Sequence, residues 1–479
     1  MPPRMHRSTA KSPVKTQINA RPTPHVPSRA VQSSSVARYN GPITRSRTAR
    51  SLASIDSLPF EVLSTIFLLT LASNDEIVQQ SSAGWTNPFP LCAVSSLWRT
   101  LALATPKLWS RVFIYVPDNE SKAMAKSKAQ LVPWIKRSGS LPLTLFIWYC
   151  RPYGCEPEFR NFVVKVLNRY ASRWEALYVP YGNAFVGNPL ELVRVHKWSS
   201  LQRMYGVNPH DTITTCAQLT HLHFPRHFSV SCTQLVHIFK GCPRLVWLSL
   251  SINVAPQSIN IPASPIILHH LSFLSFSANH LSTLFQLVSL PSLRELACQQ
   301  RELFTEVRPL RSLLSLLTRS ACTLDKLEIR GMNSLPADLV QCLTHRSCHF
   351  LTSLGIYNHP LYDIVPVNDE VLQTLTLHHD NSECTHLKFL SLHYPASRCS
   401  QSALLKMVES RISSCTTSQL QNGLLHLQIE NYLEPPNLPQ WLDEVIKRSE
   451  MEYESQESLC LRRRGFTGDV PTLDDFFWI

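Results

Sequence analysis

Histidine and cysteine are the residues of this sequence most able to do chemistry, because imidazoles and thiolates bind metals and transfer protons. The sequence contains 19 His and 14 Cys. No two cysteines are spaced as C-x-x-C, H-E-x-x-H does not occur, and no His follows a Cys at zinc spacing. We therefore predict no metal site and expect reduced, mostly buried thiols in an intracellular protein. The histidine pairs, which we expect on exposed strand faces or in turns, are His221/His223, His269/His270 and His378/His379.

Motifs for phosphate binding and nucleophilic catalysis are also missing. The sequence has no G-x-x-x-x-G-K-[ST], G-x-G-x-x-G or G-x-S-x-G, and its 13 Gly in 479 residues leave little material for phosphate-cradling loops. Asp474 and Asp475 form an isolated acidic pair without a basic partner for acid–base work. We predict that the chain is not an enzyme, has no catalytic residues and needs no cofactor.

The positive charge of the chain is concentrated at its start. Residues 1–50 hold ten of the 46 Lys and Arg and no Asp or Glu, so the other 429 residues carry 36 basic and 34 acidic groups. Residues 1–51 are also rich in Pro, Ser and Thr, which predicts a disordered basic tail. Such a tail is compatible with a nuclear address or a loose nucleic-acid contact, but we favour a solvated leader and expect no nucleic-acid partner.

Length and hydropathy indicate several domains without a membrane segment. A chain of this length exceeds one typical domain, and its 44 % hydrophobic content is ample for a core. No run reaches 18 apolar residues, and residues 1–40 lack the apolar stretch of a secretory signal. We expect a cytoplasmic or nuclear protein with no membrane partner.

The stretch 55–113 carries the most specific pattern. Asp56 or Ser57 could cap a helix with Pro59 in its first turn. Residues 73–90 read as a loop, 91–104 as a second amphipathic helix ended by Pro106, and 108–114 as the lead into a strand. The apolar positions expected on one face of the first helix are Val62, Leu63, Ile66, Phe67 and Leu69, and those of the second are Leu91, Val94, Trp98 and Leu101. So short a segment has more apolar surface than it can bury, which indicates a docking module.

These spaced residues resemble the F-box motif, in the long-insert form of the large F-box families of mushroom-forming fungi. The likeness covers about sixty residues, from Leu58-Pro59 through Val94 and Leu97-Trp98-Arg99 to Leu108-Trp109. It departs from the family in the long interval from Phe67 to Trp98 and in Ser95, where the family often has Cys. The resemblance implies docking of a Skp-family adaptor through Leu58, Pro59, Leu63, Ile66, Phe67, Val94 and Trp98.

Farther along, an L-x-x-L-x-L element or a close variant recurs ten times. The intervals between copies, 18 to 37 residues, are centred on the leucine-rich-repeat range. Helical patterns fill the gaps at residues 233–239, 310–318, 339–343 and 402–411. One such unit cannot bury its apolar face, but stacked units share a core, so we predict an irregular solenoid; a plain leucine-rich α/β domain is the alternative. The copies start at Trp174, Leu201, Leu219, Leu245, Leu271, Leu293, Leu324, Leu351, Leu387 and Leu424.

Residues between the repeat leucines should line the opposite side of the sheet, because strand side chains alternate. Trp247 and Phe273 occupy the same repeat position in adjacent copies. Together with Tyr357 and Phe389 they are candidate substrate-binding residues. Whether such aromatics anchor a partner or are covered by a loop or by the C-terminal tail stays open.

The fold class expected is α/β: a small helical F-box followed by an irregular leucine-rich-repeat-like solenoid. The domains are a tail at 1–51, the F-box at 52–113, the solenoid at 114–435 and a cap or tail at 436–479, including a helix at 440–448 and the apolar end Phe476-Phe477-Trp478-Ile479. The function implied by the resemblance is a substrate-recognition subunit of a Skp–cullin–RING ubiquitin ligase with an unknown protein substrate. Alternatives are an F-box scaffold without ligase function and, last, a nucleic-acid-associated protein acting through the tail.

Overall fold

The structure is a computed structural model in which a large parallel sheet is built from the repeated strands. It describes residues 55–71, 88–116, 121–149, 157–179, 200–206, 216–254, 264–301, 308–357, 367–377, 385–393, 399–413 and 426–430. The expected N-terminal tail, most of the expected loop at 73–90, the helix at 440–448 and the C-terminal cap lie outside these ranges. The chain divides into two compact units, Met1–Ser57, of which only the 3₁₀ turn η1 (Ile55–Ser57) is described, and Leu58–Ile479.

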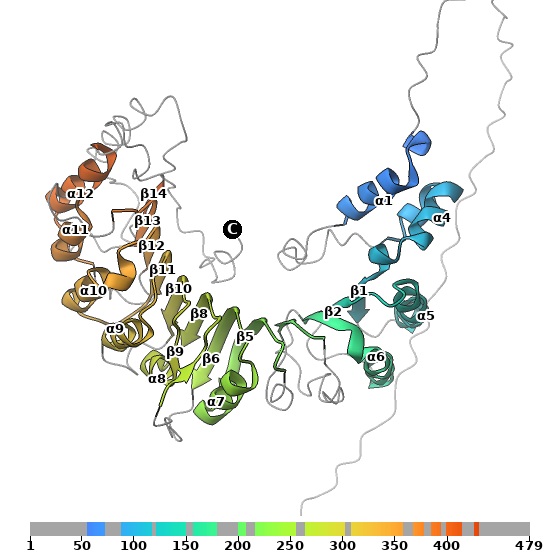
Figure 1. Cartoon of the computed structure of the whole chain (residues 1–479), viewed down its shortest axis with the longest axis horizontal. Helices are drawn as coiled ribbons and strands as arrows, with labels where there is room; N and C mark the ends of the chain where they lie inside the picture. The colour runs from blue at the N-terminus through green and yellow to red at the C-terminus, as the bar shows by residue number, and fades with distance from the viewer. Residues whose placement is uncertain are drawn as a thin grey trace, which may run out of the picture. The chain divides into compact units, whose positions relative to one another are not determined.

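Twelve parallel strands make up the main sheet, and they follow one another in chain order (Figure 1). All ten predicted repeats contribute a strand, and two further strands precede them. β7 (Ile266–Ile267) and β9 (Val288–Ser289) form a separate small sheet. The main strands are β1 (Arg111–Val116), β2 (Leu143–Tyr149), β3 (Trp174–Tyr178), β4 (Arg203–Tyr205), β5 (His221–Val230), β6 (Trp247–Val254), β8 (Phe273–Ala278), β10 (Glu295–Gln300), β11 (Lys326–Arg330), β12 (Ser353–Tyr357), β13 (Phe389–His393) and β14 (His426–Glu430).

The repeat leucines form the buried side of this sheet. Leu222, Leu248, Leu274 and Leu296 stand opposite one another in register on β5, β6, β8 and β10, and each is buried. Backbone pairing begins one residue before the strands: Val246 N donates to Thr220 O at 2.8 Å, and Ser272 N donates to Val246 O at 2.9 Å. Each copy therefore adds one hydrogen-bonded strand and one layer of leucines to a continuous core.

Helices connect the strands and pack on the leucine side, as the repeat pattern predicts. Successive helices from α8 to α12 contact one another along the sheet (Figure 1). α7 begins with a capping box, in which Gln234 N donates to Ser231 Oγ at 3.2 Å and Ser231 N donates to Gln234 Oε1 at 2.8 Å. These helices are α5 (Ser121–Arg137), α6 (Pro157–Arg169), α7 (Cys232–Gly241), α8 (Leu281–Leu287), α9 (Pro309–Ser320), α10 (Pro336–Leu343), α11 (Asp369–Leu375) and α12 (Gln401–Ser413); η3 (Ala171–Arg173) and η6 (Arg346–Cys348) are 3₁₀ turns.

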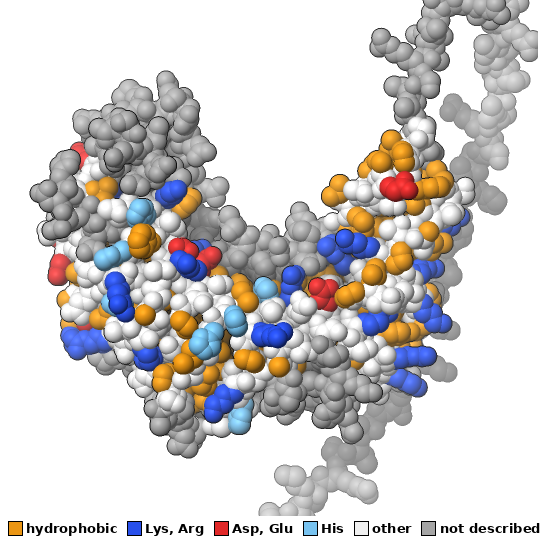
Figure 2. Space-filling view, viewed as in Figure 1, with side chains coloured by type: hydrophobic (Ala, Val, Ile, Leu, Met, Phe, Trp, Pro, Cys, Tyr) orange, Lys and Arg blue, Asp and Glu red, His pale blue; other side chains and the backbone are white. Residues whose placement is uncertain are grey.

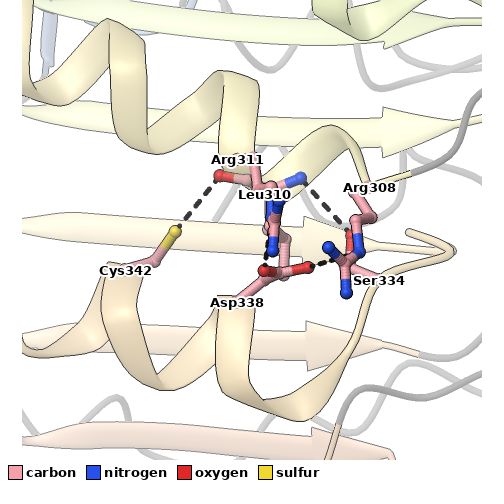
Figure 3. A network of polar contacts seen from close by, with 6 residues as sticks. All are labelled: Arg308, Leu310, Arg311, Ser334, Asp338 and Cys342. Carbon is pink, nitrogen blue, oxygen red and sulfur yellow. Dashed lines mark hydrogen bonds and ion pairs between the residues drawn. The ribbon is translucent and has the colours of Figure 1, made fainter.

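A buried carboxylate fixes α10 against the start of α9 (Figure 3). Asp338 is 3 % exposed and accepts a 3.0 Å hydrogen bond from Arg311 Nε, while Arg308 Nε lies 3.7 Å from its other oxygen. Cys342, one turn farther along α10, donates from Sγ to Leu310 O at 3.4 Å. Neighbouring repeats are thus held in register by polar contacts as well as by leucines.

In the described residues before the sheet, three α-helices occur, α1 (Phe60–Leu69), α3 (Leu91–Val94) and α4 (Ser96–Ala104), followed by the 3₁₀ turn η2 (Pro106–Trp109). Their buried residues Leu63, Phe67, Leu101 and Trp109 belong to the same apolar core as the repeats. The predicted boundary at 113/114 falls inside β1, which is the first strand of the main sheet. Helical segments and sheet therefore pack as one body.

Candidate functional site

α1 combines a buried stripe with an exposed apolar one. Leu63 and Phe67 are fully buried, whereas Val62 and Leu69 are 43 % and 80 % exposed. At about 100° per residue, Val62, Ile66 and Leu69 form a stripe about a third of a turn away from Leu63 and Phe67. The five apolar positions predicted on one face of this helix therefore divide into a buried and an exposed stripe, because only one stripe of so short a helix can reach the core.

Two more exposed apolar side chains lie at the start of the helix: Leu58 precedes it, and Phe60 is its first residue, on a different side of the helix from Val62. Leu58 and Phe60 are 37 % and 56 % exposed. We call Leu58, Phe60, Val62, Ile66 and Leu69 the α1 apolar surface. Figure 2 shows hydrophobic side chains gathered over α1 on the face drawn there. An exposed apolar cluster of this kind on a folded element is typical of a protein-binding site.

The buried stripe is held by α4 and η2. The rings of Phe67 and Trp98 lie 4.7 Å apart between centroids, and Trp109 Nε1 donates to Ala102 O at 2.7 Å. Trp109 also packs edge-on against Trp134 of α5 at 6.1 Å. Because Trp109 and Trp134 are both buried, the helix that carries the α1 apolar surface rests on a rigid support.

The expected single helix at 91–104 is interrupted at Ser95, which is a correction. Ser95 is extended, with φ −151° and ψ 169°, and its Oγ accepts a 3.1 Å hydrogen bond from Trp98 N, so it caps α4. Across the break, Arg99 Nε donates to Cys92 O at 2.9 Å. The break turns Val94 outward, 61 % exposed, and places Trp98 half-buried against Phe67. The predicted position of Pro59 is also corrected: Pro59 is the N-cap residue directly before α1 and does not lie in the first turn of the helix.

The seven predicted adaptor-binding residues therefore separate into two groups. Leu63 and Phe67 are buried and hold the helices together, whereas the others reach the surface fully or in part: Leu58, Pro59, Ile66, Val94 and Trp98. Sequence reasoning missed Phe60 as an exposed residue of this surface. The signal available was the apolar Phe60 directly after Pro59, at the start of a helix where few neighbours can cover a side chain.

A second candidate surface is the side of the sheet opposite the leucines, which we call the strand face. Trp247 and Phe273 are paired in register on β6 and β8, as predicted, and their rings stack 4.9 Å apart at an angle of 7°. Their row continues across the sheet through half-buried His221 and Arg203. This first row consists of Arg111, Thr144, Ala176, Arg203, His221, Trp247 and Phe273 on β1 to β8.

A second row lies on the same face, two residues farther along each strand. The rings of Phe113, Phe146, Tyr178 and Tyr205 stack at centroid distances of 4.8, 4.6 and 4.4 Å. The row continues through His223, Ser249 and Ser275. Phe146 and Tyr178 are buried in a small cluster with Ala176 of the first row, so this face of the sheet has its own apolar packing.

The other two predicted substrate-binding residues lie elsewhere on the strand face. Phe389 is 47 % exposed and continues the first row on β13, beyond Glu295, Lys326 and Ser353. Tyr357 lies in a later position on β12, where its ring covers Gly355 and the Arg330 guanidinium lies 4.3 Å from its centroid. The structure thus brings Trp247 and Phe273 together, but neither Tyr357 nor Phe389 joins them.

Sequence reasoning missed the aromatic residues of the first four strands and the arginines beside them. Burial lowers the pKa of the Arg111 guanidinium, and Tyr178 opposes that shift. The available signal was strand alternation in 111–116 and 143–149, which places Phe113 and Phe146 on the face opposite the apolar Val112 and Leu145. Only the pairing register shows that these rings form one stack with Tyr178 and Tyr205.

Within the described ranges, no group of three His, Cys, Asp or Glu side chains is arranged to hold a metal ion. Nine cysteines of those ranges are free thiols, and seven of them are buried, as expected for most of them. In the same part of the chain no helix has the length and apolar character to cross a bilayer.

Comparison with known proteins returned only loose structural likeness. No protein family and no curated protein matches the sequence. The crystal structure of the Rad7 and Elc1 complex in yeast contains a chain that is 14 % identical, with a TM-score of 0.34, over 79 % of this chain and 91 % of that chain. Because this superposition is so loose, the inferences below depend on the residues of the present chain.

Proposed function

We propose that this protein is a substrate-recognition subunit of a Skp–cullin–RING ubiquitin ligase. Its helical segments would be an F-box that docks a Skp-family adaptor, and its leucine-rich-repeat-like sheet would hold the protein substrate. In this role the chain binds and positions its partners, and the transfer chemistry belongs to other subunits.

The observation that carries the proposal is the α1 apolar surface. Leu58, Phe60, Val62 and Leu69 are between 37 % and 80 % exposed on a helix whose other stripe is fully buried. Exposure of this much apolar surface to water is unfavourable, and its burial by a partner would stabilise the complex by about 25 cal/mol per Å² of apolar surface buried. Among the residues of the F-box resemblance, Leu58 and Ile66 belong to this surface, Pro59 follows Leu58 in the chain, and Val94 of α3 is a further exposed apolar residue.

Adaptor binding is tested by size-exclusion chromatography of the full chain with a purified Skp-family adaptor. We expect the wild type to co-elute with the adaptor, and we expect Leu58→Ala/Pro59→Ala to abolish co-elution. Leu58→Asp should do the same, because the carboxylate would be buried in an apolar interface without a partner.

The matched control is Leu335→Asp, which places the same change at a 47 % exposed leucine before α10. That variant should co-elute like the wild type. Adaptor binding by both Leu58 variants at wild-type strength would reject the F-box assignment.

A ligase subunit must also recruit a cullin, and this separates the proposal from the scaffold alternative. With the adaptor bound, a cullin–RING preparation should be retained by the immobilised chain and lost with Leu58→Asp. Adaptor binding without cullin retention would instead favour a non-catalytic scaffold.

A further inference from the structure

The strand face carries a group of aromatic rings around Trp247 on β6. The centroid of the Trp247 ring lies 4.9 Å from that of Phe273, 5.8 Å from Tyr205, 6.0 Å from His223 and 6.4 Å from His221. We call these five residues the aromatic cluster. Each of the four neighbours also has a further interaction, so we take half-buried Trp247 as the contact residue for a ligand. A further aromatic side chain placed there would meet several rings at once.

The strand face around the aromatic cluster is positively charged. Arg203 lies two strands before Trp247 in the first row, and its Nε has no hydrogen-bond partner among the described residues. From β1 to β8 neither row contains Asp or Glu; the first acidic members are Glu295 on β10 and Glu328 on β11. A surface that is both aromatic and cationic favours a ligand that is both aromatic and acidic.

The chain itself contains a segment of this composition. Residues 465–479 include three Asp and four aromatic residues but no Lys, Arg or Glu, and their last six residues are Asp-Asp-Phe-Phe-Trp-Ile. We call residues 474–479 the acidic–aromatic segment. Residues 1–50, by contrast, carry ten Lys and Arg and no acidic residue, so the positive strand face repels them. Charge and side-chain type therefore select the acidic–aromatic segment as the occupant.

The length of the chain allows this segment to reach the aromatic cluster. β14 ends at Glu430, and residues 431–473 separate it from Asp474. These 43 residues span at most about 140 Å. β14 and β6 are six strand intervals apart in the sheet, which corresponds to about 29 Å. The acidic–aromatic segment can therefore lie on the strand face of its own chain.

We propose that the acidic–aromatic segment binds the aromatic cluster of the same chain and covers the strand face around Trp247. Its aromatic rings pack on the cluster, and its carboxylates lie in the positive field of Arg203. The contact itself is independent of the proposed function. Its consequence rests on that function: the segment occupies the surface that would hold the substrate, so a substrate must displace it.

The spacing of the segment matches the first row. In an extended backbone Asp474, Phe476 and Trp478 share one side, and about 13 Å separates the first from the last. The row from Arg203 to Phe273 covers three strand intervals, or about 14 Å. The carboxylate then lies above the row toward Arg203, where attraction by the charge requires no pocket beside the guanidinium, and the rings lie toward β6 and β8.

Photo-crosslinking in the full chain tests the contact. Trp478→p-benzoylphenylalanine places a photoreactive aromatic side chain in the segment, and peptide mass spectrometry maps the products after irradiation. We expect cross-links to peptides that contain β4, β5, β6 or β8. A mixture of isotopically light and heavy chains separates products within one chain from those between copies. Failure to cross-link these strands, or products only with α1, with other elements or between copies, would overturn the proposal.

Substitutions on both sides of the contact test its chemistry. Trp247→Ala and Asp474→Asn/Asp475→Asn should each lower the cross-link yield at least about threefold. The matched control is Phe350→Ala, which removes a 56 % exposed ring between η6 and β12, outside both rows, and should leave the yield unchanged. Circular dichroism confirms that each variant folds. A yield that neither Trp247→Ala nor the double Asn variant lowers would reject the contact.

Competition with an added peptide tests the consequence for ligand binding. The probe is a labelled peptide with the sequence of residues 469–479, followed by fluorescence anisotropy. A tethered segment competes at an effective concentration of about 1 mM, so full-length Phe476→Ser/Trp478→Ser should bind the peptide at least about tenfold more tightly than the wild type. A peptide of the same composition in scrambled order should bind neither chain. Equal binding of the probe to both chains would show that the segment does not cover the strand face.

Failure of this inference is distinguishable from failure of the proposed function. Asp474→Asn/Asp475→Asn should co-elute with the adaptor like the wild type, whereas Leu58→Asp should lose the adaptor and keep the cross-link from position 478. A chain that binds the adaptor without cross-links to β4–β8 keeps the proposed function and rejects the covering segment. Cross-links without adaptor binding would have the opposite meaning.

Discussion

At the scale of single residues, the polar groups of the buried regions act mainly as structural contacts. Asp338 illustrates this, because it is 3 % exposed and lies against Arg308 and Arg311 at the junction of α9 and α10. Its position in the first turn of α10 also suits a negative charge. The carboxylate therefore joins two neighbouring repeats.

We expect Asp338→Ala to lower the free energy of unfolding by about 2 kcal/mol, because a charge-assisted hydrogen bond and a helix-end charge are lost. Urea denaturation measures this. The matched control is Glu370→Ala, which removes an exposed carboxylate from the first turn of α11 and should change stability by less than about 0.5 kcal/mol. Equal effects of the two substitutions would contradict the structural role of Asp338.

A second prediction concerns the ionisation and reactivity of the buried thiols. Burial raises the pKa of Cys242 to about 12, with Cys216 adding to the rise, and burial followed by the Asp338 charge raises the pKa of Cys342 to about 12. Only about one thiol in ten thousand is then ionised at pH 8, and the thiolate is the reactive form.

Iodoacetamide at pH 8 should therefore modify Cys242 and Cys342 far more slowly than half-buried Cys92 in the folded protein. Labelling in urea should remove the difference, and peptide mass spectrometry reads each site. Rapid native labelling of Cys342 would show that the α9–α10 junction opens.

At the scale of elements, the break between α3 and α4 decides how the candidate docking region is presented. Ser95 is the only residue of 88–104 that is extended between two helical segments, and its hydroxyl satisfies the Trp98 N–H. Periodicity predicted one continuous helix, because the apolar spacing runs through the break unchanged.

Replacing this cap should destabilise the chain and loosen Trp98. Ser95→Ala is expected to cost about 1 kcal/mol, the usual value of an N-cap hydrogen bond. The matched control is Thr100→Ala in the same helix, where an exposed hydroxyl bonds only to Ser96 O and its loss should be nearly neutral. Thermal unfolding compares the two, and a neutral Ser95→Ala would show that the cap does not hold α4.

At the scale of the whole molecule, every strand of the main sheet pairs only with its neighbours in chain order. Stability in such an array depends on contacts between adjacent repeats, so a destabilising substitution should affect mainly its own repeat and the two beside it. Among the described residues, the apolar core links the helical segments to β1 through Trp109 and Trp134 and extends to β13 along the strands between.

Leu390→Ala on β13 should therefore raise hydrogen exchange in β12 and β14 and leave β1, β2 and adaptor co-elution unchanged. Truncation of a fully buried leucine costs about 2–5 kcal/mol, enough to open adjacent strands. Increased exchange in β1 to the same extent would mean that the sheet unfolds as a single cooperative unit.

The repeat strands and most helices could be predicted from the sequence, since both depend on local periodicity. The ten L-x-x-L-x-L copies each became a strand, and the gaps at 233–239, 310–318, 339–343 and 402–411 became α7, α9, α10 and α12. The pairing of Trp247 with Phe273 also followed, because equal positions in adjacent repeats meet in a parallel ladder. The position of the Tyr357 ring could not be predicted, because the ring lies over Gly355 of the same strand.

The sequence by itself determined the α/β repeat architecture and the apolar character of α1, because alternation and helical spacing are properties of the chain alone. Only the tertiary structure decided which apolar stripe of α1 is buried, since that depends on where Trp98 and the core lie. It also added Arg111 of β1 and Thr144 of β2 to the row of Arg203, His221, Trp247 and Phe273. These two strands precede the ten repeats, and the pairing of β2 with β3 shifts register between Leu143 and Thr144, so no repeat position specifies their place in the row.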